Sequence, residues 1–375
     1  MPLIIGWVLV IVAETAVTIY VARFLSGISY GMAYSATPMY LGEIASDEVR
    51  GAIGTLLTVM AKGGILLVFA IGPYVSIEVL AYILLVPTII FLVTFFWLPE
   101  SPYFLVGQAK HDDATKSLQW LRARDDVKDE LNMISESVRK AKENRGSFKE
   151  LFVDGNRRSL IIILGLGACQ QLCGSQAVIA YSQQIFEKVG SDLGASESSI
   201  IMAVIQLIIS VLSSSIVDRL GRRPLLLISI SGAAICNIII GLFFFLDNET
   251  DIDVKSISWL PITTIMIFIV SYTIGLATVP FALLSEIFPT NVKAIAASMY
   301  TIFASAISFG VMKLFQVVSD GLGIHITFWG FALFSFFFVA FVWFLIPETK
   351  GKPLDVILEE MNAKAKNKKK ESVVA

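Results

Sequence analysis

Charge is scarce in this sequence. Charged residues make up 16% of the 375 residues, whereas 55% are apolar and the mean hydropathy is +0.75. Because a soluble domain carries roughly a quarter charged residues, this composition excludes a water-soluble globular enzyme and also an intrinsically disordered chain. The formal net charge of −2 gives no electrostatic reason to expect a nucleic-acid partner. The composition instead predicts an integral membrane protein with the lipid bilayer as its surroundings.

Cysteine and histidine are also scarce. The three cysteines, Cys169, Cys173 and Cys236, lie in apolar stretches and are odd in number, which argues against a disulfide framework. The two histidines, His111 and His325, have no clustered partners, so we expect no metal site. The sequence motifs of phosphate-binding loops, zinc proteases and serine hydrolases are missing, so we expect neither a cofactor nor enzymatic activity.

Ten stretches are apolar and long enough to cross a bilayer, for which a helix needs about 20 residues. They are approximately 3–19, 21–43, 52–74, 78–98, 158–187, 196–217, 224–246, 259–287, 293–318 and 323–346. The first two run together, with Ala22 and Arg23 at the join. Gly174, Gly275 and Pro280 fall inside two long stretches and predict tilted or broken helices there. The predicted fold class is an all-α integral membrane protein of about ten helices.

A polar segment at 99–157 separates the first four stretches from the last six. It is rich in helix formers, with charges of both signs three and four positions apart, which predicts amphipathic helices on the membrane surface. The sequence thus predicts an N-terminal bundle (1–98), a linker (99–157), a C-terminal six-helix bundle (158–346) and a polar tail (347–375).

Lysine and arginine gather on one side of the predicted bundle, in the linker, the tail and the loops on that side. By the positive-inside rule this side is cytoplasmic, so the linker and the C-terminus are expected in the cytoplasm. The sequon Asn248-Glu249-Thr250 then faces away from the cytoplasm, where Asn248 can carry an N-glycan. We expect a multi-pass protein of the plasma membrane.

A repeated pattern connects the two bundles. It consists of a proline, a glutamate one to two turns later, and a basic residue seven positions after the glutamate. The two copies are Pro38, Glu43 and Arg50, and Pro280, Glu286 and Lys293. Paired repeats are typical of secondary transporters, which bind substrate between their halves.

Several further motifs resemble those of the sugar porter branch of the major facilitator superfamily. They include Arg23-Phe24-Leu25-Ser26-Gly27, Pro99-Glu100-Ser101-Pro102, Gln170-Gln171-Leu172-Cys173-Gly174, Asp218-Arg219-Leu220-Gly221-Arg222-Arg223, Glu286-Ile287-Phe288-Pro289 and Pro347-Glu348-Thr349-Lys350-Gly351. The likeness extends in order over nearly the whole chain, and within the branch it is greatest to the insect trehalose-facilitator group. It implies the two-bundle architecture of that superfamily and facilitated, alternating-access transport of a hexose or a trehalose-like disaccharide.

The charged residues of these motifs lie at predicted cytoplasmic helix ends. They are Glu43, Arg50, Glu100, Asp218, Arg219, Arg222, Arg223, Glu286, Lys293 and Glu348. Opposite charges there can pair in one conformation and separate in another, which predicts a gate. Plain anchoring by solvated charges is the alternative. The repeated spacing and the family resemblance favour the gate.

The candidate substrate site is rich in amide side chains. Four glutamines lie in apolar stretches, where an unpartnered amide is costly. Amides offer both a donor and an acceptor to neighbouring hydroxyls, so a sugar suits them; hydrogen bonds between helices are the alternative. The resemblance assigns the four positions to sugar contact, and an aromatic ring can cover an apolar sugar face. The candidate contacts are Gln170, Gln171, Gln176, Gln206, Tyr181 and Phe281.

The sequence also departs from the family pattern. Gln176 and Gln206 stand where sugar porters carry Asn, and Thr58 stands where Gln is common. Lys62, in the middle of a stretch, can face a wet cavity or pair with Glu14. The family has twelve helices, so we expect this chain to lack the first two. A non-transporting membrane protein, a sensor or a regulatory partner of carriers, is the alternative function; no obligate protein partner is inferred.

Overall fold

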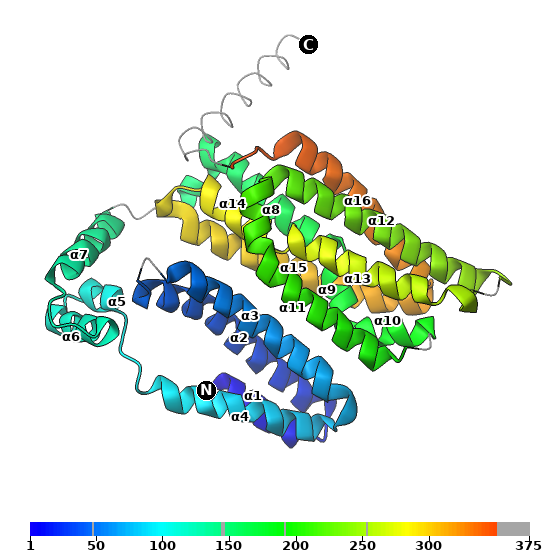
Figure 1. The fold of residues 1–375 in the computed structure, drawn as a ribbon, viewed down its shortest axis with the longest axis horizontal. Helices are drawn as coiled ribbons and strands as arrows, with labels where there is room; N and C mark the ends of the chain where they lie inside the picture. The colour runs from blue at the N-terminus through cyan, green and yellow to red at the C-terminus, as the bar shows by residue number, and fades with distance from the viewer. Residues whose placement is uncertain (47–48, 144–146, 191–192, 253, 351–375) are drawn as a thin grey trace, which may run out of the picture. The chain divides into compact units, whose positions relative to one another are not determined.

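The structure, a computed structural model, describes residues 1–46, 49–143, 147–190, 193–252 and 254–350 (Figure 1). All regular elements in these ranges are helices, which confirms the predicted all-α class. The chain divides into two compact units, Met1–Asn144 and Arg145–Ala375, and each is described by itself.

The first unit contains four apolar helices followed by three short ones, of which α6 and α7 are rich in charge. They are α1 (Pro2–Ile11), α2 (Ala16–Ile44), α3 (Arg50–Ile71), α4 (Ile77–Phe95), α5 (Pro102–Gly107), α6 (His111–Arg122) and α7 (Lys128–Glu143), with a 3₁₀ turn at Gly72–Tyr74. α1 packs against both α2 and α4, and α5 packs against α6 and α7. These three short helices, which belong to the predicted linker, therefore form part of the first unit.

The predicted join of the first two stretches is wrong. α1 ends at Ile11 and α2 begins at Ala16, so Ala22 and Arg23 lie inside α2. Thr15 is extended and its hydroxyl oxygen accepts the Thr18 backbone N–H at 3.3 Å, which caps α2 at this point. A cap of one side chain decides this boundary, because the apolar run continues across it. The predicted first span is thus a helix of 10 residues, about 15 Å long and too short to cross a bilayer.

The polar helices of the first unit are fastened to the end of α2. Arg122 donates to the Ile44 carbonyl at 2.9 Å, and Glu130 holds the same guanidinium at 2.8 Å. The hydrogen bonds from Arg122 keep the pKa of Glu130 below its ordinary value, against the opposing effect of partial burial. A small apolar core lies beneath these contacts and contains Leu105, Val106, Ala114, Leu118, Val127 and Ile134.

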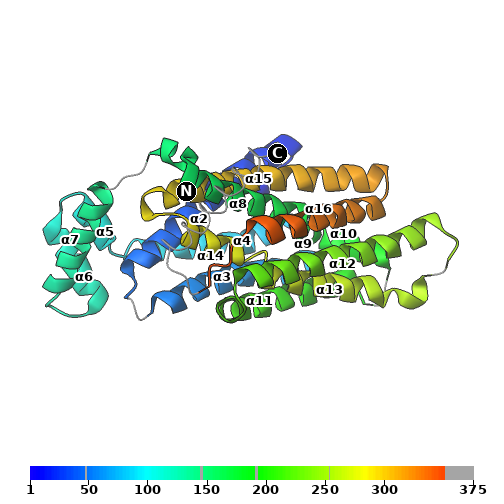
Figure 2. The same cartoon turned by 90° about the horizontal axis from the view of Figure 1, so that it is seen from above.

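The second unit contains the longer helices. They are α8 (Asp154–Leu172), α9 (Ser175–Ala180), α10 (Ser182–Val189), α11 (Ala195–Leu220), α12 (Arg222–Glu249), α13 (Trp259–Ile274), α14 (Val279–Ile287), α15 (Thr290–Gly321) and α16 (Ile324–Leu345), with 3₁₀ turns at Phe148–Phe152 and Lys255–Ile257. α12 packs against both α13 and α16, α8 packs against α15, and α11 packs against α13 (Figure 2). α12 is therefore packed on two sides, by α13 and by α16.

The predicted helix breaks are confirmed. α8 ends at Leu172 and α9 starts at Ser175, with Gly174 between them at φ +87°. A side chain at Gly174 would also meet the Phe331 ring, its Cβ lying 2.3 Å from the nearest ring atom. α13 ends at Ile274, before Gly275, and Pro280 lies in the first turn of α14, where its missing N–H costs nothing.

Eight segments among the described residues are long and apolar enough to cross a membrane. They are Leu56–Tyr74, Ile77–Phe95, Asn156–Ala180, Ala195–Ser213, Arg222–Glu249, Trp259–Ile287, Asn291–Gly321 and Ile324–Leu345. Each corresponds to one of the ten predicted stretches. The other two predicted stretches correspond to the short α1 and to α2, which has 29 residues but is more polar. The chain is therefore a multi-pass membrane protein.

Candidate substrate site and charge cluster

Gln170 connects the two helix breaks of the second unit. Its side chain donates from Nε2 to the Leu276 carbonyl at 3.1 Å, and its Oε1 accepts the Tyr300 hydroxyl at 2.7 Å. Leu276 lies in the break between α13 and α14, whereas Gln170 stands in the last turn of α8. Gln170 is buried, and both ends of its amide have protein partners. It therefore acts as a bridge between helices in this conformation.

Gln171 and Gln176 lie on either side of the first break. Gln171 is buried and donates to Gln170 Oε1 at 3.5 Å, but its own Oε1 has no hydrogen-bond partner among the described residues. Gln176 is half-buried in α9, next to the buried Ser175, whose hydroxyl donates to the Gln170 carbonyl at 2.9 Å. The break thus places amides and hydroxyls close together inside an apolar bundle.

Gln206 is 2% exposed on α11, and its Nε2 has no partner among the described residues. A buried amide donor left unsatisfied costs about 1–3 kcal/mol. Gln171 supplies an orphaned acceptor and Gln206 an orphaned donor. A hydroxyl group can serve either one, because it both donates and accepts.

Three polar contacts at the breaks were missing from the sequence candidates. The Asn237 amide donates to the Cys173 carbonyl at 3.1 Å, and the Ser229 hydroxyl accepts the Leu276 N–H at 3.1 Å. Tyr300 binds Gln170, as described above. Asn237 carried the same signal as the glutamines, a polar side chain in an apolar stretch. Nothing in the sequence singles out Tyr300 or Ser229, since tyrosine and serine are both ordinary in membrane helices.

The two candidate aromatic residues lie apart from one another. Tyr181 stacks on Phe315 with ring centroids 5.0 Å apart, and its hydroxyl donates to the Met312 carbonyl at 3.4 Å. Phe281 is 48% exposed and meets the Tyr300 ring edge-on at 5.5 Å. Phe281 therefore adjoins the Gln170 bridge, whereas Tyr181 adjoins α15.

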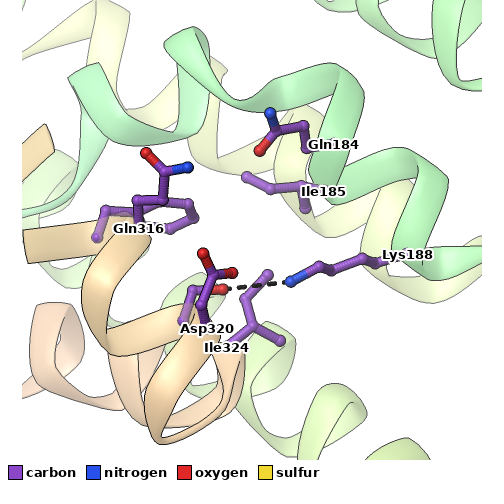
Figure 3. A pocket seen from close by; sticks show the side chains of 8 residues that line it. Gln184, Ile185, Lys188, Gln316, Asp320 and Ile324 are labelled. Carbon is purple, nitrogen blue, oxygen red and sulfur yellow. Dashed lines mark hydrogen bonds between the residues drawn. The ribbon is translucent and has the colours of Figure 1, made fainter. Parts of the chain in front are cut away.

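A small pocket opens beyond Tyr181, between α10 and α15 (Figure 3). Gln184 and Lys188 lie on one side of it and Gln316 and Asp320 on the other. The Lys188 amine donates to the Ser319 hydroxyl at 3.4 Å across the pocket. None of the predicted sugar contacts lines this pocket.

A charge cluster joins α12, α14 and the segment after α16. Arg222 and Glu286 form an ion pair at 2.7 Å with both side chains largely shielded from solvent, at 13% and 23% exposure. The Thr349 hydroxyl donates to the other Glu286 oxygen at 2.5 Å. Three of the predicted gate motifs of the second unit thus meet at one point.

Glu348 caps the N-terminus of α12. Its carboxylate accepts the backbone N–H groups of Arg222 and Arg223, each at 3.1 Å, and those of Thr349 and Lys350. Partial burial opposes ionisation of this carboxyl, but the four N–H donors outweigh it and hold the pKa of Glu348 below its ordinary value. This negative charge also faces the positive end of the helix dipole.

The remaining gate candidates of the second unit lie at the edge of this cluster. Arg223 donates to the Trp343 carbonyl at 2.6 Å, and its guanidinium lies 5.2 Å from the centre of the Trp343 ring. Lys350 donates to the Arg219 carbonyl at 2.5 Å, while the Lys293 amine donates to the Ser285 carbonyl at 3.4 Å. The side chain of Asp218 lies outside the described residues.

The first unit repeats part of this arrangement. Glu43 accepts the Ser101 hydroxyl, just as Glu286 accepts that of Thr349. Glu100 precedes Ser101 and accepts its backbone N–H at 3.3 Å. The side chain of Arg50 lies outside the described residues. The two glutamate-and-hydroxyl contacts therefore follow the repeat seen in the sequence.

The predicted pairing of Lys62 with Glu14 is not found. Lys62 lies in the middle of α3, whereas Glu14 lies in the turn between α1 and α2. None of the residues that the structure describes forms an ion pair with Lys62. That Lys62 faces a water-filled cavity stays a prediction.

Long apolar helices that pack together, two of them broken beside buried amides, define a helical membrane protein. The chain belongs to the sugar (and other) transporter family, whose sequence model matches residues 2–361.

Individual relatives are insect proteins. The facilitated trehalose transporter Tret1 of Anopheles gambiae is 38% identical over 363 residues, which cover 96% of this chain and 46% of that protein. Tret1 of Aedes aegypti is 37% identical, with 96% and 45% covered, and Tret1 of Culex quinquefasciatus is 36% identical, with 96% and 70% covered. The chain thus spans about half the length of the first two relatives.

Solved structures share the fold. The inward-open xylose transporter XylE from E. coli has a TM-score of 0.75 at 21% identity, over 96% of this chain and 81% of that one. The proton:xylose symporter XylE bound to 6-bromo-6-deoxy-D-glucose has a TM-score of 0.67 at 22% identity, over 96% and 82%. The chain therefore has the all-α fold of these structures, as the sequence predicted.

Proposed function

We propose that this protein carries a sugar, a hexose or a trehalose-like disaccharide, across the plasma membrane by facilitated alternating access, without covalent chemistry. The observation that carries the proposal is the pair of orphaned amide atoms, Gln171 Oε1 and Gln206 Nε2, buried in the same bundle as the two helix breaks. A polyol offers hydroxyls to both atoms. The trehalose transporters among the relatives support a disaccharide of this kind.

The proposed ligand contacts centre on the two amides that have an atom without a hydrogen-bond partner among the described residues, Gln171 and Gln206, together with the neighbouring Gln176. Gln171, Gln176 and Gln206 face the sugar, while Gln170 holds the site in shape from behind. Phe281, beside Tyr300, covers an apolar face of the sugar. Tyr181 contributes from the α15 side. Intramembrane carboxylates suited to proton coupling are scarce in the sequence, which supports facilitated diffusion over proton symport.

Uptake of labelled trehalose and glucose by sugar-transport-deficient cells tests this function. Saturable uptake is expected, and Gln171→Ala should reduce it at least about tenfold, since it removes an amide that meets the ligand in a dry site. Gln183→Ala is the matched control, because Gln183 lies in α10 and hydrogen-bonds Glu187 at an exposed position. Binding of trehalose without any uptake would contradict transport and favour a sensor.

The cytoplasmic gate is part of the same proposal. The Arg222–Glu286 pair forms in the described conformation and separates in the opposite one, so it sets the relative stability of the two. Glu286→Gln should lower the maximal uptake rate several-fold at unchanged surface expression. Identical uptake kinetics in Glu286→Gln and the parent protein would reduce this pair to an anchor.

A further inference from the structure

α12 carries two buried polar side chains on its packed face, Ser229 and Asn237. Ser229 is 1% exposed and Asn237 is fully buried. Each contacts the backbone of a different broken helix: Asn237 the Cys173 carbonyl, and Ser229 the Leu276 N–H. α12 itself is continuous over 28 residues. One unbroken helix therefore holds both breaks.

These contacts satisfy backbone groups that a helix break leaves open. A helix end exposes carbonyl and N–H groups with no partner inside the helix, and in an apolar bundle water does not replace them. Leu276 has both of its groups held by side chains, the N–H by Ser229 and the carbonyl by Gln170. Since Gln170 belongs to the other broken helix, the two breaks are also tied to each other.

Packing alone does not account for Asn237. Its Oδ1 has no hydrogen-bond partner among the described residues, and an apolar side chain of similar size would fill the space without that cost. The donor half of the amide, by contrast, meets the Cys173 carbonyl at 3.1 Å. The hydrogen bond to the Cys173 carbonyl is therefore the contribution of the Asn237 amide to the structure.

We propose that Asn237 is a positioning residue of the candidate sugar site: by holding the Cys173 carbonyl it fixes the turn between α8 and α9 that sets Gln171 and Gln176 around the ligand. Gln171 precedes Cys173 by two positions, and the Gly174 N–H that follows it donates to the Gln171 carbonyl at 3.1 Å. Ser229 has the same role at the second break. This inference rests on the proposed function in its ligand, but its backbone contact is testable without one.

Cys173 provides a local probe of the turn. It is fully buried, as is Cys169, and all three cysteines are free. A protein with Cys169→Ala and Cys236→Ala keeps Cys173 as its single thiol. Its rate of alkylation by N-ethylmaleimide, measured by mass spectrometry on purified protein in nanodiscs, reports how often the turn opens.

Two substitutions separate the hydrogen bond from the packing. Asn237→Leu removes the amide and keeps a branched side chain of four heavy atoms, whereas Asn237→Ala removes both the amide and the bulk. We expect both to speed alkylation of Cys173 about tenfold, because the freed carbonyl destabilises the closed turn. Ile235→Ala, on the exposed side of the same helix, is the control and should leave the rate unchanged within about twofold.

A faster rate in Asn237→Ala alone would show a cavity effect and overturn the positioning role, as would unchanged rates in both. Each variant is first checked for a single gel-filtration peak, and Asn237→Val replaces the leucine variant if that one aggregates.

Sugar readouts distinguish this inference from the proposed function. In cells, Asn237→Leu should raise the apparent KM for trehalose about tenfold while keeping the maximal rate within about threefold. A change of maximal rate alone, at equal KM, would assign Asn237 a merely structural role. If alkylation rises as expected but trehalose neither slows it nor is taken up, the sugar assignment fails while the contact at the break stands.

Discussion

Gln170 and Gln206 are both buried glutamines in apolar helices, but their surroundings differ. Gln170 has a partner at each end of its amide, Leu276 and Tyr300. Gln206 Nε2 has none among the described residues. A partnered buried amide adds to stability, while an unpartnered one subtracts from it. The two positions therefore respond to the same substitution with opposite sign.

Gln170→Leu should lower the free energy of unfolding by about 2–3 kcal/mol, because two partners lose their hydrogen bonds. Gln206→Leu should leave it unchanged or raise it by about 1 kcal/mol, since the orphaned donor disappears. Thermal unfolding of the purified protein in one detergent measures both. If Gln206→Leu were as destabilising as Gln170→Leu, Gln206 would be a contact between helices.

Sequence reasoning reached the residue types of this site but not their partners. The glutamines were found because an amide in an apolar stretch is costly, and Asn237 could have been found in the same way. Both ends of the Gln170 amide are hydrogen-bonded, whereas one end of the Gln171 amide is not. This difference arises because the partners of Gln170, Leu276 and Tyr300, lie more than 100 positions further along the chain. No local pattern carries that information.

At the scale of helices, the break after α13 depends on a close approach at Gly275. A Cβ on this residue would lie 2.4 Å from the Ser229 Cβ and 2.8 Å from the Leu225 carbonyl oxygen. α12 and the end of α13 can therefore meet only where one of them has no side chain.

Gly275→Ala should destabilise the second unit by about 2–4 kcal/mol, because the backbone must shift to admit the methyl group. Gly310→Ala is the matched control in α15. A Cβ there has no neighbour within 4 Å, and alanine is the better helix former, so stability should stay or rise by up to about 1 kcal/mol. Thermal unfolding separates the two outcomes, and equal stability of both variants would contradict the close approach.

Glu348 makes the N-terminus of α12 sensitive to acid. A carboxylate whose pKa is lower in the folded state than in the unfolded one stabilises the fold at pH values above the unfolded pKa, which is about 4.5 here. This stabilisation is lost as the pH falls below that value and through the folded-state pKa.

Glu348→Gln should therefore cost about 1 kcal/mol at pH 7, the usual contribution of a helix cap. The difference between the two proteins should shrink below about pH 4.5. Unfolding measured from pH 7 to pH 3.5 tests this, and a difference that did not change with pH would assign the effect to the amide's geometry.

The elements themselves were largely predictable. Long apolar runs reveal membrane helices, and Gly174 and Gly275 revealed the breaks because glycine inside such a run weakens the helix. The boundary at Thr15 was not predictable from hydropathy, since the apolar run passes over it. Hydropathy averaged over a stretch of about twenty residues does not reveal a helix boundary that is set by one capping side chain.

At the scale of the whole molecule, α12 relates the charge cluster to the sequon. Arg222 begins this helix and Asn248 stands exposed in its last turn. Its 28 residues correspond to about 42 Å, more than the roughly 30 Å of a bilayer's hydrocarbon core. The two ends therefore lie on opposite sides of the membrane.

With the basic cluster in the cytoplasm, Asn248 should receive an N-glycan. Treating the protein from insect cells with a glycosidase should increase its mobility on a gel, and Asn248→Gln should remove that shift. An epitope inserted after Thr250 should be reached by antibody from outside intact cells. Access from the cytosol alone would reverse the orientation.

The family and its fold were accessible from sequence because the motifs are short and lie at helix ends, where charge and glycine are needed for local reasons. The sugar is a different matter. In the proposed function it is selected by a few side chains, such as Gln176 and Gln206, at which this chain departs from the family pattern.

The contact between Glu348 and α12 also orders the biosynthesis of the protein. The N-terminus of α12 is made 126 residues before the carboxylate that caps it. While the ribosome is still translating α13, the Arg222 side chain lacks Glu286, which belongs to α14. The first N–H groups of α12 lack Glu348 until the segment after α16 has been made. The second unit can therefore reach its final packing only after the last membrane helix has left the ribosome, so its assembly is a late, post-insertional event.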